Sequence, residues 1–404
     1  MIMNCCHLHM EPVQKRTCCS HYFPMAFLLF VCFLVGSPYI INYKRITPRY
    51  EVGRLVLNQN SSPCESHGKP SGSETLPQGI ISSTSNLEMQ PLWQSSRSSS
   101  RKNKVESSKN LLAIAVGIKQ KKVVNDIVKK FYASKFTVML FHYDGVVDEW
   151  RDLEWSDSVL HVSAINQTKW WFAKRFLHPD IVTEYSYIFL WDEDLGVENF
   201  HPGGYLSIIK KEGLEISQPA LDFSKSQVHY QITARLRKGN VHRRTYKFSG
   251  GGRCYANSTA PPCTGWVEMM APVFSRDAWR CVWHMIQNDL IHAWGLDTKL
   301  GYCTRGDRTK TVGVVDSEYI VHKGIPSLGG DVKSSRETTG HNSLPDASDS
   351  RIPVRSAPNL SNARLEIRRR SYAESEMFTR RWKNAVATDK CWVDPYPSRS
   401  NSTS

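Results

Sequence analysis

An apolar segment that ends in three acidic residues is the feature that most constrains the fold of this chain. Residues 185–191 read YSYIFLW, the aromatic and branched composition of a buried strand, and Asp192, Glu193 and Asp194 follow directly. Carboxylates spaced i, i+2 repel each other unless something neutralises them. Because ligands of α/β sheets bind at the carboxyl ends of strands, the pattern predicts a metal–phosphate site, with a solvated acidic turn as the alternative.

The segments around this strand alternate between strand and helix patterns. Strands are expected over 111–116, 136–142, 158–162, 266–275 and 312–315, and helices over 120–132, 169–177 and 277–294. This alternation predicts an α/β domain with a mainly parallel central sheet and helices on both faces. A separate helix over 365–386 carries Phe378, Trp382 and Val386 on one face, and we expect it to dock on the core with Cys391 tethered.

An uncharged apolar stretch over 23–41 is close to the length that spans a bilayer as a helix. It predicts an uncleaved signal anchor, and a cleaved signal peptide is the alternative because Gly36 and Ser37 suit a cleavage site. Basic residues lie on both sides of it, so they do not fix the orientation.

The predicted organisation of the whole chain follows from composition. In order, we expect a cytoplasmic tail (1–22), a transmembrane signal anchor (23–41), a disordered stem (42–109), the α/β domain (110–330), a disordered linker (331–362), a C-terminal helix and docking segment (363–395) and a disordered tail (396–404).

Cysteines and glycosylation motifs place the bulk of the chain in an oxidising lumen. Six cysteines follow the apolar stretch, an even number that is compatible with disulfide bonds, and Cys254 with Cys263 would close a short loop. Five N-x-S/T motifs, each weak alone, are compatible with a glycoprotein. The net charge of +14 is spread along the chain rather than gathered in one patch, so no nucleic-acid partner is predicted.

Three further residues are candidates for chemistry beside Asp192 and Asp194. His322 follows an apolar strand, and a Mg²⁺ or Mn²⁺ site can accept one imidazole beside its carboxylates. Asp297, in a loop that reads WGLD, would suit a general base, and Glu268 is a second base candidate. The structural alternatives are a hydrogen-bonded histidine at His322, a turn cap at Asp297 and a paired buried carboxylate at Glu268.

Trp191 directly precedes the acidic residues. We include it among the residues that bind a donor, together with Asp192 and Asp194. By residue type alone, a tryptophan at the end of an apolar strand favours the core.

Several motifs together resemble a plant family of membrane-anchored proteins of unknown function. They are AVGIKQK, FLWDEDL, TGWVEMMAPVFSR, WGLDTKLGYC and VVDSEYIVHKG, with RWKNAV and CWVDP near the C-terminus. Members often carry the inherited description "lysine-ketoglutarate reductase trans-splicing related". The Gly-x-Gly-x-x-Gly turn of a pyridine-nucleotide reductase is missing after any predicted strand, so reductase activity is not expected.

The same region is similar in layout to glycosyltransferases with a single nucleotide-diphospho-sugar-binding α/β domain. This resemblance implies a site for Mn²⁺ or Mg²⁺ formed by Asp192, Asp194 and the late His322. In it Asp194 and His322 ligate the metal, and Asp192 faces the donor ribose or a metal-bound water. The resemblance also implies that Asp297 is the base. It implies a Golgi membrane protein, single-pass type II, that transfers sugar from a nucleotide sugar to a glycan or another hydroxyl acceptor.

Three other function classes compete with the transferase. A non-catalytic luminal protein of the same fold would bind glycan or a protein partner. A phosphohydrolase would use Asp192 as its nucleophile, but such sites have D-x-D-x-T/V early in the domain, whereas Gly196 stands at the last position here. A redox enzyme is the remaining class.

Overall fold

A computed structural model describes residues 69–81, 89, 109–248, 253–325 and 360–396 of the chain. The predicted tail and membrane anchor, most of the stem and most of the linker lie outside the described residues. No helix within the described ranges is long and apolar enough to cross a membrane.

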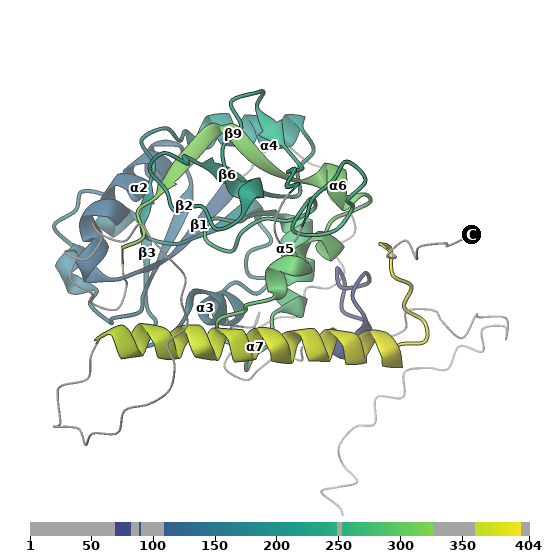
Figure 1. Ribbon diagram of the computed structural model, residues 1–404. Helices are drawn as coiled ribbons and strands as arrows, with labels where there is room; N and C mark the ends of the chain where they lie inside the picture. The colour runs from purple at the N-terminus through teal and green to yellow at the C-terminus, as the bar shows by residue number, and fades with distance from the viewer. Residues whose placement is uncertain (1–68, 82–88, 90–108, 249–252, 326–359, 397–404) are drawn as a thin grey trace, which may run out of the picture. The chain divides into compact units, whose positions relative to one another are not determined.

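A mixed sheet with strand order β3-β2-β1-β4-β8-β6-β9-β5 forms the centre of the protein, and β7 pairs with β9 (Figure 1). Its strands are β1 (Lys109–Val116), β2 (Thr137–His142), β3 (Leu160–Ser163), β4 (Tyr185–Trp191), β5 (Leu195–Gly196), β6 (Ile216–Leu221), β7 (Val241–His242), β8 (Val273–Ser275) and β9 (Val312–His322).

The sheet is mainly parallel, as the alternating pattern predicts. Strand β1 runs parallel to both β2 and β4, β2 to β3, and β6 to β9. Strand β8 lies between β4 and β6 and is antiparallel to both. Two successive reversals cancel, so β4, β6 and β9 point the same way and their carboxyl ends share one edge.

Helices cover both faces of the sheet. They are α2 (Lys121–Ala133), α3 (Lys169–Phe176), α4 (Pro202–Lys211), α5 (Arg276–Met285), α6 (Arg308–Thr311) and α7 (Leu360–Thr388). Short 3₁₀ turns are η1 (Gln78–Ile80), η2 (Ile118–Gln120), η3 (Asp148–Trp150), η4 (Ser156–Ser158), η5 (Gln231–Thr233), η6 (Leu296–Thr298) and η7 (Leu300–Cys303).

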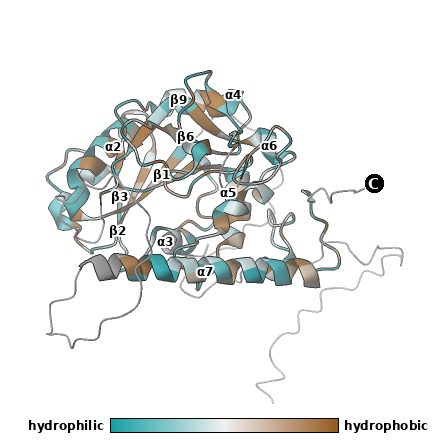
Figure 2. Cartoon of the chain, in the orientation of Figure 1, coloured by the Kyte–Doolittle hydropathy of each residue, from teal (hydrophilic) through white to brown (hydrophobic). Residues whose placement is uncertain are grey.

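Two hydrophobic clusters fill the space between these helices and the sheet. Helices α2 and α4 contribute to one cluster, and α3, α5 and α7 to the other. In α2 the buried residues are Val124, Ile127, Val128 and Phe131, the spacing of one helical face. Figure 2 shows the apolar strands enclosed by more polar helices.

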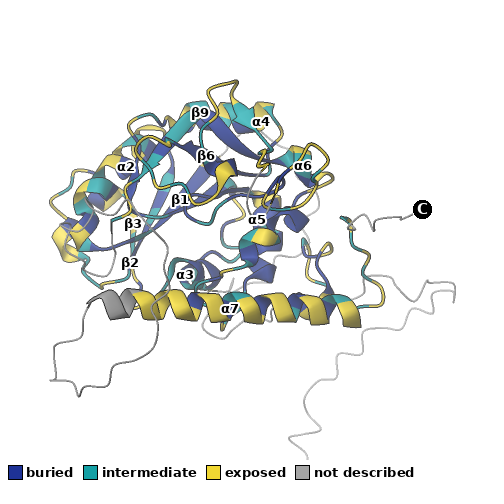
Figure 3. Ribbon diagram, viewed as in Figure 1, coloured by how far each residue is buried: buried dark blue, intermediate teal, exposed yellow. Residues whose placement is uncertain are grey.

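The C-terminal helix α7 docks on the core as predicted and is longer than predicted. Its buried face includes Phe378 and Trp382, while the opposite face is exposed (Figure 3). The basic run Arg368–Arg370 is exposed, in keeping with a solvated helix face.

Two predicted elements are shorter in the structure. Only 273–275 of the expected strand 266–275 are strand, because side chains satisfy the preceding backbone: Lys169 binds the carbonyls of Met269 and Met270, and Gln218 accepts from the Glu268 amide. The expected helix 277–294 begins at 276 and ends at 285. Of the apolar residues that follow, Ile286, Leu290 and Ala293 are buried in a loop rather than on a helical face, and Trp294 is exposed.

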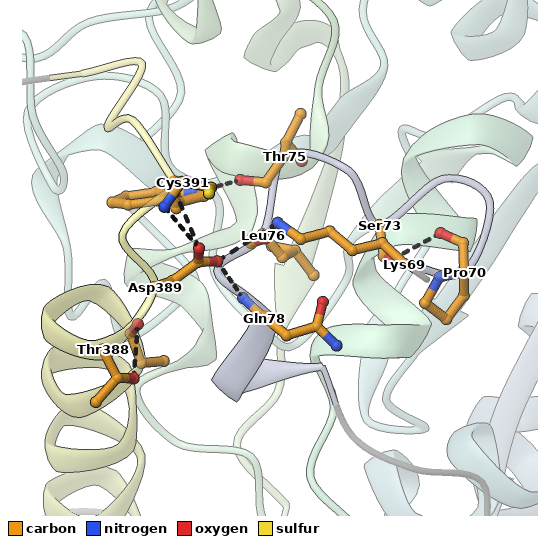
Figure 4. A network of polar contacts seen from close by, with 11 residues as sticks. Lys69, Pro70, Ser73, Thr75, Leu76, Gln78, Thr388, Asp389 and Cys391 are labelled. Atoms are coloured by element: carbon orange, nitrogen blue, oxygen red, sulfur yellow. Dashed lines mark hydrogen bonds and ion pairs between the residues drawn. The ribbon is translucent and has the colours of Figure 1, made fainter. Parts of the chain in front are cut away.

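Residues 69–81, predicted as disordered stem, pack on the α/β domain. Leu76 and Ile80 are fully buried in the core. The Asp389 carboxylate accepts from the Gln78 amide at 2.8 Å and lies 3.6 Å from Lys69 Nζ. Figure 4 shows this network, which joins the segment before the sheet to the segment after α7.

Disulfide bonds join Cys254 to Cys263, as the spacing suggests, and Cys281 to Cys303. Cys391 is disulfide-bonded as well. Two of the glycosylation motifs are within the described ranges, and Asn166 and Asn257 are both exposed.

Candidate functional site

The acidic residues after β4 lie at the carboxyl edge of the sheet and turn in different directions. Asp192 Oδ1 lies 2.6 Å from Lys169 Nζ, and the Asp192 amide donates to the Met270 carbonyl. Although 40% of the Asp192 side chain is accessible, the surrounding protein raises its pKa by desolvation, and the Lys169 ammonium opposes that rise. The ion pair therefore neutralises the first carboxylate of the predicted acidic pair.

Glu193, between the two aspartates, points back toward the end of β1. Its carboxylate accepts from the Gly117 amide at 2.7 Å and from the Tyr143 hydroxyl at 2.5 Å. Burial raises the pKa of Glu193 to about 7, against these two hydrogen bonds. A Cβ atom at position 117 would overlap the Tyr143 hydroxyl, so this arrangement requires glycine there.

Asp194 is paired with His322, the last residue of β9. Asp194 Oδ2 lies 3.3 Å from His322 Nε2 and accepts from the Ile325 amide at 3.1 Å. The hydrogen bond with Asp194 raises the pKa of His322, against the effect of burial. The contact arises because β5, just after Asp194, pairs antiparallel with the end of β9.

Glu268 lies in the irregular segment before β8 and carries a carboxyl oxygen without a partner. Oε2 is buried, and no hydrogen-bond partner for it occurs among the described residues. Burial raises the pKa of Glu268 to about 7. The charges of His322 and Lys169 lower that pKa, and those of Asp192 and Asp297 raise it. Glu268 is therefore electrostatically coupled to the acidic residues.

Asp297 lies in η6 and accepts from the amide of the next residue, Thr298, at 2.9 Å. Burial raises its pKa, against hydrogen bonds from the Thr298 backbone and the Trp266 side chain. The contact with Thr298 is with the adjacent residue and does not cap η6, whose N-cap residue is Gly295. The charge of Asp297 contributes to the raised pKa of Glu268.

Trp191 is fully buried and lines the core instead of the open side of the site. Its ring packs edge-on against Phe131 at 5.1 Å and Phe200 at 4.9 Å. Its indole nitrogen has no hydrogen-bond partner in the described part of the chain. A ring in this position supports the strand and offers no face to a donor.

Of the six predicted residues, the structure places Asp194 and His322 in contact, and it couples Asp192, Glu268 and Asp297 to this pair or to each other through their charges. It also adds residues that sequence reasoning missed. Lys169 heads α3, far from any acidic motif, so no local signal marks it as a partner of Asp192. The same is true of Gln218, Tyr143 and Gly117, which act through contacts between distant segments.

Asp194 and His322 are the two candidate ligands for a divalent cation, and they contact each other directly. Within the described ranges, no group of three or more His, Cys, Asp or Glu side chains is arranged to hold a metal. Magnesium is commonly held by one or two protein ligands with water and substrate phosphates, and His322 Nδ1 is a buried nitrogen without a partner among the described residues. Asp192 is turned toward Lys169 instead.

Fold and site together define an α/β protein with a carboxylate–imidazole cluster at the carboxyl edge of a mainly parallel sheet. Residues 67–388 match a family described as "Protein of unknown function (DUF707)". The chain belongs to this family, which confirms the predicted membership of a family of unknown function. No curated protein matches the chain.

Proposed function

We propose that this protein is a metal-dependent glycosyltransferase of the secretory pathway that moves a sugar from a nucleotide-sugar donor to a hydroxyl acceptor. One observation carries the proposal: the Asp194–His322 pair lies in the same cluster as two carboxyl groups with raised pKa values, Glu268 and Asp297. A transferase needs both a site for a diphosphate and a base for the acceptor.

Asp194 and His322 would hold Mn²⁺ or Mg²⁺, and the bound metal would stabilise the charge of the leaving diphosphate. Asp192 lies beside them and remains the candidate contact to the donor ribose. Lys169, which is ion-paired to Asp192, would add a positive charge to that of the metal at this edge of the sheet.

Glu268 and Asp297 are the two candidates for the base that takes the proton from the acceptor hydroxyl. The pKa of Glu268, about 7, is close to that of an efficient base at neutral pH. Its Oε2 atom is the carboxyl oxygen left without a partner among the described residues, whereas Asp297 already accepts from its own turn. Glu268 is therefore the stronger candidate for proton transfer, and Asp297 acts on it through its charge.

The Lys169–Asp192 ion pair favours a second candidate function. An ammonium 2.6 Å from Asp192 neutralises that carboxylate without a metal. A non-catalytic luminal protein that binds glycan or a protein partner would retain such a pair. In either function we propose a Golgi membrane location with the α/β domain in the lumen, anchored through residues 23–41.

Nucleotide binding by the full-length protein in detergent separates the two functions. We expect UDP or GDP to bind in calorimetry when Mn²⁺ is present and to lose that binding when the metal is chelated. Failure of both nucleotides to bind a folded sample would reject the transferase and leave the non-catalytic protein.

A further inference from the structure

Exposed aromatic side chains occur in three separate segments that are linked to the candidate bases. Tyr230 precedes η5, Trp294 lies in the loop after α5, and Tyr372 belongs to α7. Their exposed fractions are 41%, 40% and 58%. Large aromatic surfaces left open to water beside polar groups commonly mark a binding surface.

Tyr230 is joined to Asp297 through Trp266. The Tyr230 and Trp266 rings lie 4.4 Å apart, and the buried Trp266 side chain hydrogen-bonds Asp297. The charges of Asp297, Glu268 and Tyr372 all contribute to a raised pKa of Tyr230, after the larger effect of burial. Tyr230 therefore contacts Trp266 and is electrostatically coupled to both candidate bases and to Tyr372 of α7.

Trp294 and Tyr372 form the other side of this aromatic set. Their rings meet edge to face at 5.0 Å. Trp294 is three residues before Asp297, and α7 contacts the loop just ahead of Trp294: Glu374 accepts from the His292 amide at 2.8 Å. Gly295, with φ of 91°, lets the loop approach Ser375 closely. The rings are thus fixed relative to Asp297.

Flat rings beside carboxylates match the chemistry of a sugar. A pyranose has a face of C–H groups that packs on an aromatic ring, while its hydroxyl groups donate to carboxylate oxygens. Glu268 Oε2 is buried and without a partner among the described residues, and it is the acceptor oxygen that such a hydroxyl would fill.

We propose that Tyr230, Trp294 and Tyr372 form a saccharide-binding subsite that holds the acceptor with a hydroxyl at Glu268 and Asp297. This inference rests on the proposed function for the role of the bound sugar as acceptor, and it narrows the acceptor to a glycan. The stacking surface itself depends only on the three rings.

Tyr246 and Phe248 provide a matched control. They are exposed aromatics on a hairpin after β7, where their rings stack at 6.3 Å, and Lys247 lies between them. If exposed rings alone attract sugar, replacing these residues weakens binding as much as replacing Tyr230 or Tyr372.

The test is a titration of the full-length protein in detergent with gluco-, xylo-, manno- and galacto-oligosaccharides. We expect one class to bind, with affinity reduced about tenfold in Tyr230→Ala and in Tyr372→Ala. Tyr230→Phe and Tyr372→Phe keep the ring and should retain binding. Tyr372→Leu keeps apolar surface without a flat face and should not. Tyr246→Ala and Phe248→Ala should bind as the unaltered protein does.

The subsite is rejected if none of the four classes binds, if the ring variants bind as the unaltered protein does, or if the control variants lose equal affinity. Titration of the same samples with UDP and GDP in Mn²⁺ separates the two proposals. Ring-dependent sugar binding without nucleotide binding would reject the transferase and keep the subsite. Nucleotide binding with no ring-dependent sugar binding would reject the subsite and keep the transferase.

Discussion

At the scale of single residues, the candidate site holds carboxyl groups whose pKa values are raised chiefly by burial. Glu268 illustrates the energetic consequence. Its pKa rises from 4.5 to about 7 in the folded protein, so between these pH values the folded state keeps a proton that the unfolded state releases. The free energy of unfolding therefore falls as pH rises through this window.

Replacing Glu268 with Gln should remove this pH-dependent loss of stability. We expect Glu268→Gln to be more stable than the unaltered protein at pH 8, by about 3 kcal/mol, and nearly equal to it at pH 4. Urea denaturation at several pH values measures the difference. Glu376→Gln, on the exposed face of α7, is the control and should show no such trend. A gain in stability that is the same at every pH would contradict a raised pKa for Glu268.

The Asp194–His322 pair gives a second prediction at this scale. Asp194→Ala should abolish Mn²⁺-dependent nucleotide binding while the melting temperature shows that the fold is retained. Asp277→Ala removes an exposed carboxylate on α5 that pairs with Arg305 at the surface, and this variant should bind nucleotide as before. Undiminished nucleotide affinity in Asp194→Ala, measured by calorimetry, would remove Asp194 from the metal site.

Most of the candidate site was predictable because an acidic residue or a histidine at the end of an apolar run is recognisable in the sequence. Asp192 and Asp194 follow an apolar run, and His322 ends one. No such pattern identifies Lys169, because its partner Asp192 is 23 positions away in the chain and only folding brings the two together. Trp191 shows the reverse: it adjoins the site in sequence but turns into the core.

At the scale of elements, continuous apolar runs predict strands and interrupted ones do not. Strands β1, β2 and β4 are expected and present. Strand β6 is fully buried yet reads ISQPAL, and its polar residues are satisfied inside: Ser217 accepts from the Tyr205 hydroxyl, and Gln218 accepts from the Glu268 amide. A pattern of apolar residues cannot reveal a strand whose polar side chains bind within the core.

Helix α7 positions the loop that carries Asp297. The buried Glu374 carboxylate accepts from both the amide and Nδ1 of His292, at 2.8 and 3.0 Å. The same loop begins after Met285, where α5 ends nine residues before the predicted end of the helix at 294. These contacts with α7 replace the hydrogen bonds that a continued helix would have made.

Removing this carboxylate should loosen the loop. We expect Glu374→Ala to lower the free energy of unfolding by about 1–3 kcal/mol, because it leaves the His292 donors unpaired. Glu376→Ala, two positions along on the exposed face, should change stability little. Chemical denaturation compares the two variants, and equal stabilities would show that Glu374 does not hold the loop.

At the scale of the whole molecule, the two segments that flank the α/β domain are joined to each other. Asp389 accepts from the Gln78 amide and from the Cys391 and Trp392 amides, and the Trp392 indole donates to the Thr75 carbonyl at 2.8 Å. The hydrogen bond from Gln78 is the largest of the effects that lower the pKa of Asp389.

Protonation of Asp389 should weaken this junction. Because its pKa is lowered by folding, the stabilisation is present above the ordinary value of 3.8 and is lost as pH falls through the folded pKa. We expect Asp389→Ala to destabilise the protein at pH 7 by about 1–2 kcal/mol and to have a smaller effect at pH 3. Thermal melting at both pH values tests this, and an equal effect at both would contradict it.

The junction also determines where a mechanical load enters the protein. A pull applied at Lys69 acts first on Asp389 and Trp392, and on the buried Leu76 and Ile80, before it reaches β1. Each of these contacts acts as an anchor point that resists displacement. Tension on the chain ahead of the domain is therefore taken up at the end of α7, and the sheet edge that carries the candidate site is shielded from it.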